Sequence, residues 1–206
     1  YDIQNLEESS SLSLDGIDEY IKINKGSEFF GDEGDFTIST WINLHSQPSG
    51  QEPIFESDIE NQLQLMILSN GKLTCNVGGG LVGESSSYNW ELNTWYNVIL
   101  RNESGNLNFY VNGNELVVTT SDNGNINSRN YNSLNIGKED DQFSSNLFFD
   151  GTISHFMYWD AALSFEEIGM VMICPSEINN LHLVGKWSIG EGSGSTLYDG
   201  FGNPNA

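Results

Sequence analysis

The run Glu56-Ser57-Asp58-Ile59-Glu60 holds the carboxyl groups of this chain that are best spaced for acid–base chemistry. Side chains alternate along a strand, so Glu56, Asp58 and Glu60 would project from one face. Such a set can supply a nucleophile, an assisting acid and a general acid for glycoside hydrolysis with retention, which needs two carboxyls about 5 Å apart. A run of acidic residues is usually a solvated part of the surface, so we expect a solvated acidic loop here, with hydrolysis as the alternative.

Acidic residues close to glycine form a second group of candidate functional residues. Asp15 and Asp18 lie near one glycine, Asp150 precedes another, and residues 139–141 are Glu-Asp-Asp. A hard cation such as Ca²⁺ needs several oxygen ligands that converge from separate loops. Aspartate beside glycine also caps turns by accepting backbone N–H groups. We expect turn capping from Asp15 and Asp18, and the alternative is a calcium site formed by Asp15, Asp18 and Asp150.

Four aromatic residues fall in segments that are predicted to be loops. Tyr88 and Trp90 follow a glycine-rich stretch, and Tyr131 and Phe143 lie among polar residues. Aromatic rings in loops can stack on sugar rings, while neighbouring amide and carboxylate groups bind the sugar hydroxyls. Tyr88, Trp90, Tyr131 and Phe143 are therefore the candidate ligand-binding residues, and packing in the core is the alternative role for each.

These candidates must be positioned by β-strands, because hydrophobic residues alternate through most of the chain. In the predicted strand 36–44, four apolar residues share one face: Phe36, Ile38, Ile42 and Leu44. Asn-Gly pairs at 70–71 and 112–113 each separate two apolar runs, and this pair tolerates the positive φ angles of a tight hairpin. The 22 glycines supply the further turns that many short strands need. The pattern predicts an all-β protein.

Residues 147–168 predict a strand followed by a short capped helix. We expect a turn at Gly151, after which alternation sorts the apolar residues onto two faces. One face would carry Ile153, Met157 and Trp159, and the other Phe156 and Tyr158.

The helix that follows is predicted from its start signal. Ser164 lies three residues before Glu167, which is the spacing of a capping box. Phe165, Ile168, Val171 and Met172 would form its apolar stripe, about two turns long. A helix of that length can cover one part of a sheet but cannot form a domain of its own.

Several phrases together resemble the laminin-G-like group of concanavalin A-like jelly rolls. They are Leu14-Asp15-Gly16-Ile17-Asp18-Glu19-Tyr20-Ile21, Phe36-Thr37-Ile38-Ser39-Thr40-Trp41-Ile42, Thr94-Trp95-Tyr96-Asn97-Val98 and Leu107-Asn108-Phe109-Tyr110-Val111-Asn112-Gly113, followed by the late strand and helix. The resemblance covers roughly residues 11 to 172 in the expected order. It implies a two-sheet antiparallel jelly-roll sandwich with one short helix near 165–172.

The same resemblance bears on the acidic residues. The carboxylate spacing at 56–60 is similar to the Glu-x-Asp-x-Glu signature of bacterial β-glucanases and laminarinases on this fold. Those enzymes bury an apolar residue where this chain has Ser57, and that departure argues against catalysis. Relatives of the laminin-G-like group commonly carry aspartate after the Gly-x-Ile of the late strand, where this chain has Ser154 and His155. That departure favours turn capping over the structural calcium site that the resemblance implies.

We expect three parts along the chain: an extended segment at 1–10, the jelly roll at 11–172, and a connector or the start of a following module at 173–206. The chain begins with Tyr1, and its last part resembles the openings of modules in surface proteins of marine bacteria and in viral structural proteins. The protein is therefore expected to be part of a larger multi-module or multi-copy assembly, outside the cell or on a cell or virion surface.

The charge excludes some partners. There are 29 acidic and 7 basic residues, which gives a formal net charge of −22. Such a field repels a phosphate backbone, so nucleic acid is not an expected partner. No run of about 18 apolar residues is present, so insertion into a membrane is not expected either.

Cys75 and Cys174 are the two cysteines. In an oxidising compartment they can form a disulfide, and closing a loop of about 100 residues would contribute ~4–5 kcal/mol on the entropic model. Cys75 lies in a predicted strand and can equally pack as a small apolar residue in the core.

The function that we expect is recognition without catalysis, with glycans or neighbouring protein subunits as partners. A glycan-binding or adhesion module comes first. A purely structural capsid, tail or appendage domain is the alternative, and a glycoside hydrolase of the laminarinase type is the third candidate.

Overall fold

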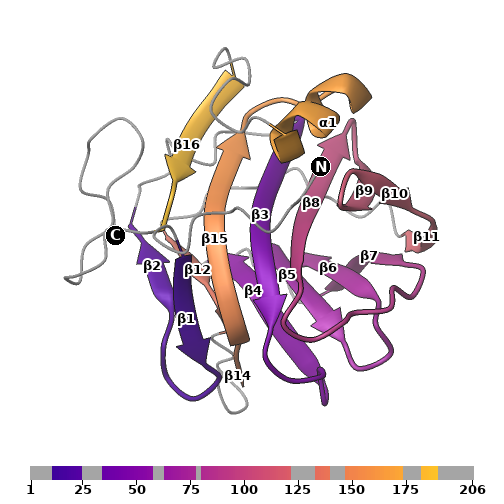
Figure 1. The fold of residues 1–206 in the computed structure, drawn as a ribbon. Helices are drawn as coiled ribbons and strands as arrows, with labels where there is room; N and C mark the ends of the chain where they lie inside the picture. Colours follow the sequence, from indigo (N-terminus) through magenta and orange to yellow (C-terminus); the bar gives the residue numbers. More distant parts are fainter. Residues whose placement is uncertain are drawn as a thin grey trace.

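Two antiparallel sheets face each other across an apolar interior (Figure 1). The computed structural model describes residues 11–24, 34–57, 63–77, 80–121, 133–139, 147–173 and 182–189. Within these ranges, no helix is long and apolar enough to cross a membrane. This arrangement confirms the predicted two-sheet jelly-roll sandwich.

Sheet A, the first of the two, is built around a long late strand. Its order is β1 (Ser11–Asp15), β15 (Asp150–Trp159), β3 (Phe36–Leu44), β8 (Trp95–Glu103), β9 (Asn106–Val111) and β10 (Asn114–Leu116). A further strand, β16 (Leu183–Trp187), also pairs with β15. The sheet therefore extends beyond the boundary that we placed at residue 172.

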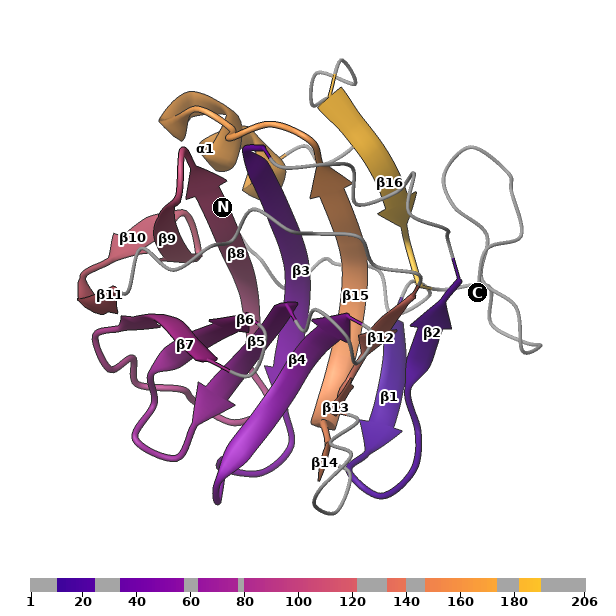
Figure 2. The same cartoon turned by 180° about the vertical axis from the view of Figure 1, so that it is seen from behind.

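Sheet B lies behind sheet A, as the view from the opposite side shows (Figure 2). Its order is β11 (Val118–Ser121), β7 (Gly80–Ser85), β6 (Leu73–Val77), β5 (Leu63–Leu68), β4 (Gln51–Ser57), β12 (Leu134–Ile136) and β2 (Ile21–Ile23). A two-stranded ribbon, β13 (Lys138–Glu139) with β14 (Leu147–Phe148), lies beside β4, and the helix α1 spans Phe165–Ile173.

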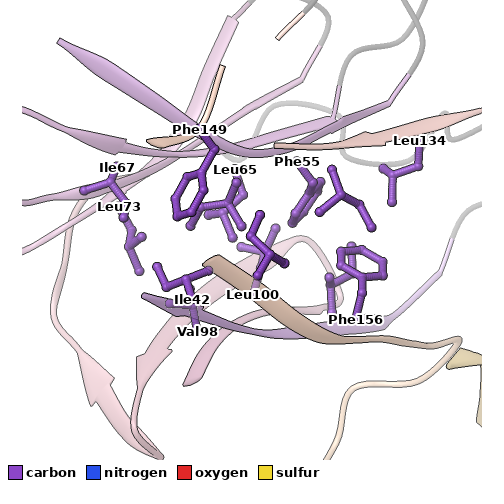
Figure 3. Close-up of a cluster of buried hydrophobic side chains, with 14 of the residues drawn as sticks. Ile42, Phe55, Leu65, Ile67, Leu73, Val98, Leu100, Leu134, Phe149 and Phe156 are labelled. Atoms are coloured by element: carbon purple, nitrogen blue, oxygen red, sulfur yellow. The ribbon is translucent and has the colours of Figure 1, made fainter. Parts of the chain in front are cut away.

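The core fills the space between the two sheets with alternate side chains from each strand (Figure 3). The four residues predicted to share a face of β3 are all buried in this cluster: Phe36, Ile38, Ile42 and Leu44. Cys75 is buried there too, as a free thiol in the core, while Cys174, its predicted alternative partner, lies outside the described residues. Burial of its sulfur raises the pKa of the thiol to about 12.

Both predicted Asn-Gly turns are present. Gly71 has φ +80° between β5 and β6, and Asn112 and Gly113 have φ +50° and +71° between β9 and β10. At 112–113 both central residues have positive φ, which is the signature of the turn that matches the twist of a hairpin, whereas at 70–71 only the glycine does.

Strand β15 differs from its prediction in register. Gly151 lies inside the strand, paired with Leu44 on β3, and is not a turn. A β-bulge falls between Ser154 and Met157, and His155 has φ +49°. The extra residue shifts the alternation, so Ile153 joins Phe156 and Tyr158 in the core instead of sharing a face with Met157.

Helix α1 begins with the predicted capping box. The Ser164 backbone N–H donates to Glu167 Oε2 at 2.7 Å, and the Glu167 N–H donates to Ser164 Oγ at 3.3 Å. The helix packs on the outer face of sheet A in a second cluster: Ile99, Tyr110, Met157, Trp159, Leu163, Ile168 and Val171. Phe165 was expected in the buried stripe but is 73% exposed, since it lies on the side of α1 away from the sheet.

Candidate functional site

A row of polar residues crosses five strands on the outer face of sheet B. The backbone register aligns Lys22, Asn135, Glu56, Gln64 and Asn76 on β2, β12, β4, β5 and β6. Gln64 links the row, since its Nε2 donates to Glu56 Oε1 at 3.0 Å and to Glu139 Oε1 at 3.2 Å, and its Oε1 accepts from Asn76 Nδ2 at 3.2 Å. Within the row, Glu56, Gln64 and Asn76 therefore form a hydrogen-bonded network together with Glu139.

Glu56 is the candidate nucleophile that the structure describes. It is 1% exposed, and β4 continues through Ser57, so both residues lie in a strand and not in the solvated loop that we expected. Ser57 faces inward and its Oγ accepts the Leu63 N–H at 2.6 Å. Asp58 and Glu60 lie outside the described residues. A glycan in solvent would not reach a carboxyl group that is buried to this extent.

Of the candidate metal ligands, Asp15 caps a turn and Asp150 lies in a strand pair. Asp15 Oδ1 accepts the Ile17 N–H at 2.9 Å, which is the turn capping that we expected. Asp150 is paired with Asp15 across β1 and β15, while Asp18 is exposed in the following turn. In the part of the chain that the structure describes, no three His, Cys, Asp or Glu side chains converge as a metal site would require.

Asp150 takes part in a contact that joins the two sheets. Its backbone N–H donates to Glu52 Oε1 at 2.5 Å, which connects β15 of sheet A to β4 of sheet B. The Asp150 carboxylate lies 3.6 Å from His45 Nδ1, and His45 Nε2 lies 3.0 Å from Thr152 Oγ1. Burial, aided by the nearby Asp150 charge, raises the pKa of Glu52 to about 7, although the bond from the Asp150 N–H acts in the opposite direction.

This contact predicts a pH dependence of stability. The pKa of Glu52 rises from 4.5 in the unfolded chain to about 7 in the folded one. The stabilisation that comes from its protonated carboxyl group is therefore fully present below pH 4.5 and is lost as the pH rises through 7. We expect the midpoint of thermal unfolding to fall across that range in the native protein. Glu52→Gln should flatten the fall, because glutamine mimics the protonated acid. Glu166→Gln, a change at an exposed position, should leave the fall of the midpoint with pH unchanged. An equal fall in the native protein and both variants would contradict the assignment of the pH dependence to Glu52.

The aromatic candidates divide between the core and the surface. Trp90 is 4% exposed and its Nε1 donates to the Gly71 carbonyl at 2.9 Å, so it is a core residue and not a stacking platform. Tyr88 is half-buried. The centroid of its ring lies 4.8 Å from that of Trp90 and 5.6 Å from that of Tyr96. Tyr131 and Phe143 lie outside the described residues. Tyr88, which is only half-buried, therefore remains a candidate.

An open pocket lies elsewhere, where the edge of sheet A meets the edge of sheet B. Its volume is about 530 Å³ and its lining comes from β9, β10 and β11: Asn106, Leu107, Asn108, Glu115, Leu116, Val117 and Val118. We call this the edge pocket. Asn108 is held in place, since its Oδ1 accepts from Arg101 Nη1 at 3.0 Å and its Nδ2 donates to Glu115 Oε1 at 2.7 Å.

The residues of the edge pocket were not among the predicted site residues. Asn106 and Asn108 alternate with buried Leu107 and Phe109, which is a signal for an exposed polar face on β9. That signal marks a solvated strand as readily as a binding surface. Only the meeting of β9 with the crossover from β10 to β11 turns it into a pocket.

The model of a known family matches residues 15–169, and its description is the concanavalin A-like lectin/glucanases superfamily. The chain belongs to this superfamily. The match covers most of the sandwich and confirms the resemblance found from the sequence. A search of curated protein sequences finds no match. Within the superfamily, the likeness to known structures lies in the fold.

Three solved structures illustrate that likeness. The heptameric SAP-like pentraxin of Limulus polyphemus is 16% identical, with a TM-score of 0.64 over 95% of this chain and 94% of the pentraxin chain. A Bacteroides ovatus protein, provisionally assigned as carbohydrate-binding, is 16% identical with a TM-score of 0.62 over 95% of this chain and 54% of its own. Trypanosoma rangeli sialidase is 18% identical with a TM-score of 0.53, over 71% of this chain and 24% of the sialidase. What the three structures share with this chain is the fold of the sandwich.

Proposed function

We propose that this chain is a non-catalytic glycan-binding module displayed on a cell or virion surface. The edge pocket is the observation that carries the proposal, because it joins polar groups that are fixed in place to accessible apolar surface. Its polar side chains are Asn106, Asn108 and Glu115, and Val117 in its wall is 71% exposed. In the polar row on sheet B, by contrast, the side chains of Glu56, Gln64 and Asn135 are buried.

The chemistry of the edge pocket suits a sugar. Sugars present hydroxyl groups in the plane of the ring and C–H groups on its faces, so a site needs directed donors and acceptors beside apolar contact. Asn108 supplies the directed group, and its two hydrogen bonds hold the side-chain amide in one orientation. A group that is already oriented loses little conformational entropy when a ligand binds.

We expect Asn108→Ala to weaken glycan binding by about fivefold, the worth of one hydrogen bond. Binding of an oligosaccharide identified on a glycan array is measured by isothermal titration calorimetry. Asn89→Ala is the matched control, because Asn89 is exposed in the loop beside Tyr88 and does not line the edge pocket. Loss of binding in Asn89→Ala with retention in Asn108→Ala would transfer the site to the Tyr88 loop.

A structural role in subunit contacts is the second candidate, and the outer side of α1 favours it. Phe165, Met170 and Ile173 are all exposed there, and apolar groups gathered on one helix mark contact surfaces. The Limulus polyphemus pentraxin is heptameric, so a related sandwich does assemble. Sedimentation analysis distinguishes the candidates: a symmetric assembly that Phe165→Asp disrupts, with no glycan bound, favours the structural role.

Hydrolysis of laminarin by Glu56, Asp58 and Glu60 is the third candidate. The burial of Glu56 argues against it. Release of reducing sugar that disappears in Glu56→Gln would place hydrolysis first.

A further inference from the structure

We infer that the edge pocket selects glycans that carry a protonated amine over glycans that are neutral or anionic. The inference rests on the proposed function and names the ligand class for the same pocket. It is carried by a directed chain of hydrogen bonds that runs from Arg101 through Asn108 and ends at Glu115 in the pocket wall.

The start of the chain is fixed to the body of the protein. Arg101 Nε donates to the Leu163 carbonyl at 2.8 Å, and its Nη2 forms an ion pair with Glu103 Oε2 at 3.0 Å. Its remaining nitrogen, Nη1, donates to Asn108 Oδ1. The positive charge of Arg101 is therefore offset by the Glu103 carboxylate, and the group that Arg101 directs toward the pocket is the Nη1–H bonded to Asn108.

The direction of the chain decides what the pocket offers. The asparagine oxygen is used as an acceptor from Arg101, so its Nδ2 must be the end that donates to Glu115. A carboxylate accepts hydrogen bonds and donates none. The chain therefore ends in an acceptor, and a ligand that completes it has to donate.

Hydroxyl and ammonium groups both donate, and charge separates them. No ion pair joins Glu115 to a basic residue within the described ranges, and no lysine or arginine is among the residues that line the pocket there. The protein as a whole has a formal net charge of −22, so the surrounding electrostatic field has the same sign as the Glu115 carboxylate. An ammonium group gains from both, whereas a sulfate or carboxylate on a sugar is repelled by both.

The pocket also limits how the charge is presented. Leu116, Val117 and Val118 provide apolar wall beside Glu115. An amine attached to a sugar ring places its charge next to C–H groups, which match that wall. We therefore assign amino sugars as the ligand class.

The test compares two oligosaccharides of equal length and linkage, a β-1,4 glucosamine tetramer and its N-acetylated counterpart. Titrations are made at low salt and mildly acidic pH, where the amine is protonated. We expect about a threefold preference for the amine form, the size of an exposed ion pair. The preference should disappear in Glu115→Gln, which keeps an oxygen to accept from Asn108, and should remain in Glu166→Gln.

Each other result overturns a stated part. Equal affinity for the two tetramers in the native protein would leave a glycan pocket without amine selection. Two results would show that net charge alone is responsible. One is a preference for the amine form that falls equally in Glu115→Gln and Glu166→Gln. The other is a lysine tetramer that binds as tightly as the glucosamine tetramer. If neither tetramer binds and no glycan on the array binds, the proposed function itself is overturned.

Discussion

Replacing Phe156 with alanine is expected to lower the free energy of unfolding by about 3–5 kcal/mol. Phe156 is fully buried, and its ring centroid lies 5.8 Å from Phe55 on sheet B and 6.0 Å from Trp187 on β16. The substitution removes the ring that links three strands and leaves a cavity that the two sheets cannot close without moving. Urea denaturation at equilibrium measures the change.

Phe165→Ala is the matched control for this experiment. It is the same chemical change, but on a ring that is largely exposed on α1, so we expect an effect within about 0.5 kcal/mol. A comparable loss in both variants would show that the bulge in β15 does not place Phe156 in the core as the register indicates.

Gly71→Ala is expected to destabilise the protein by about 2–5 kcal/mol, for two reasons that add. The residue has φ +80°, where an L side chain costs about 1–2 kcal/mol. A Cβ there would also lie closer than 3.0 Å to the Tyr88 carbonyl oxygen, and overpacking costs about 1–3 kcal/mol. The turn cannot move away easily, because the Gly71 carbonyl accepts from both the Tyr88 N–H and Trp90 Nε1.

Two other glycines separate these reasons. Gly105 has φ +86° and no atom within 4 Å of an added Cβ, so Gly105→Ala measures the backbone cost alone. Gly50 has neither a positive φ nor a neighbour, so Gly50→Ala should change stability little. Thermal and urea unfolding of the three variants should rank Gly71 above Gly105 and Gly105 above Gly50. Gly71→Ala no worse than Gly105→Ala would contradict the proposed contact with Tyr88.

Much of the fold could be predicted because its signals are local. The alternation in β3, the two Asn-Gly turns and the Ser164–Glu167 cap each depend on residues a few positions apart. The faces of β15 could not be assigned in the same way. A single inserted residue near His155 reverses every later side chain, and the sequence alone does not mark where it is inserted.

The candidate site was harder to predict because burial depends on the whole fold. Glu56 and Trp90 belong to residue types that serve glycan sites, yet both are covered in the folded chain. The edge pocket depends on contacts that local patterns do not report. Asn108 is seven residues from Arg101 and seven from Glu115, and they meet because β8, β9 and β10 are neighbours in sheet A.

The position of β1 has a consequence for how the chain folds during synthesis. Among the described strands, β1 pairs only with β15, whose first residue, Asp150, is paired with Asp15 at the end of β1. During synthesis β1 therefore cannot pair until β15, about 140 residues later in the sequence, has left the ribosome. Contacts so distant along the chain close slowly, and until then one edge of β3 also stays unpaired and open to intermolecular association.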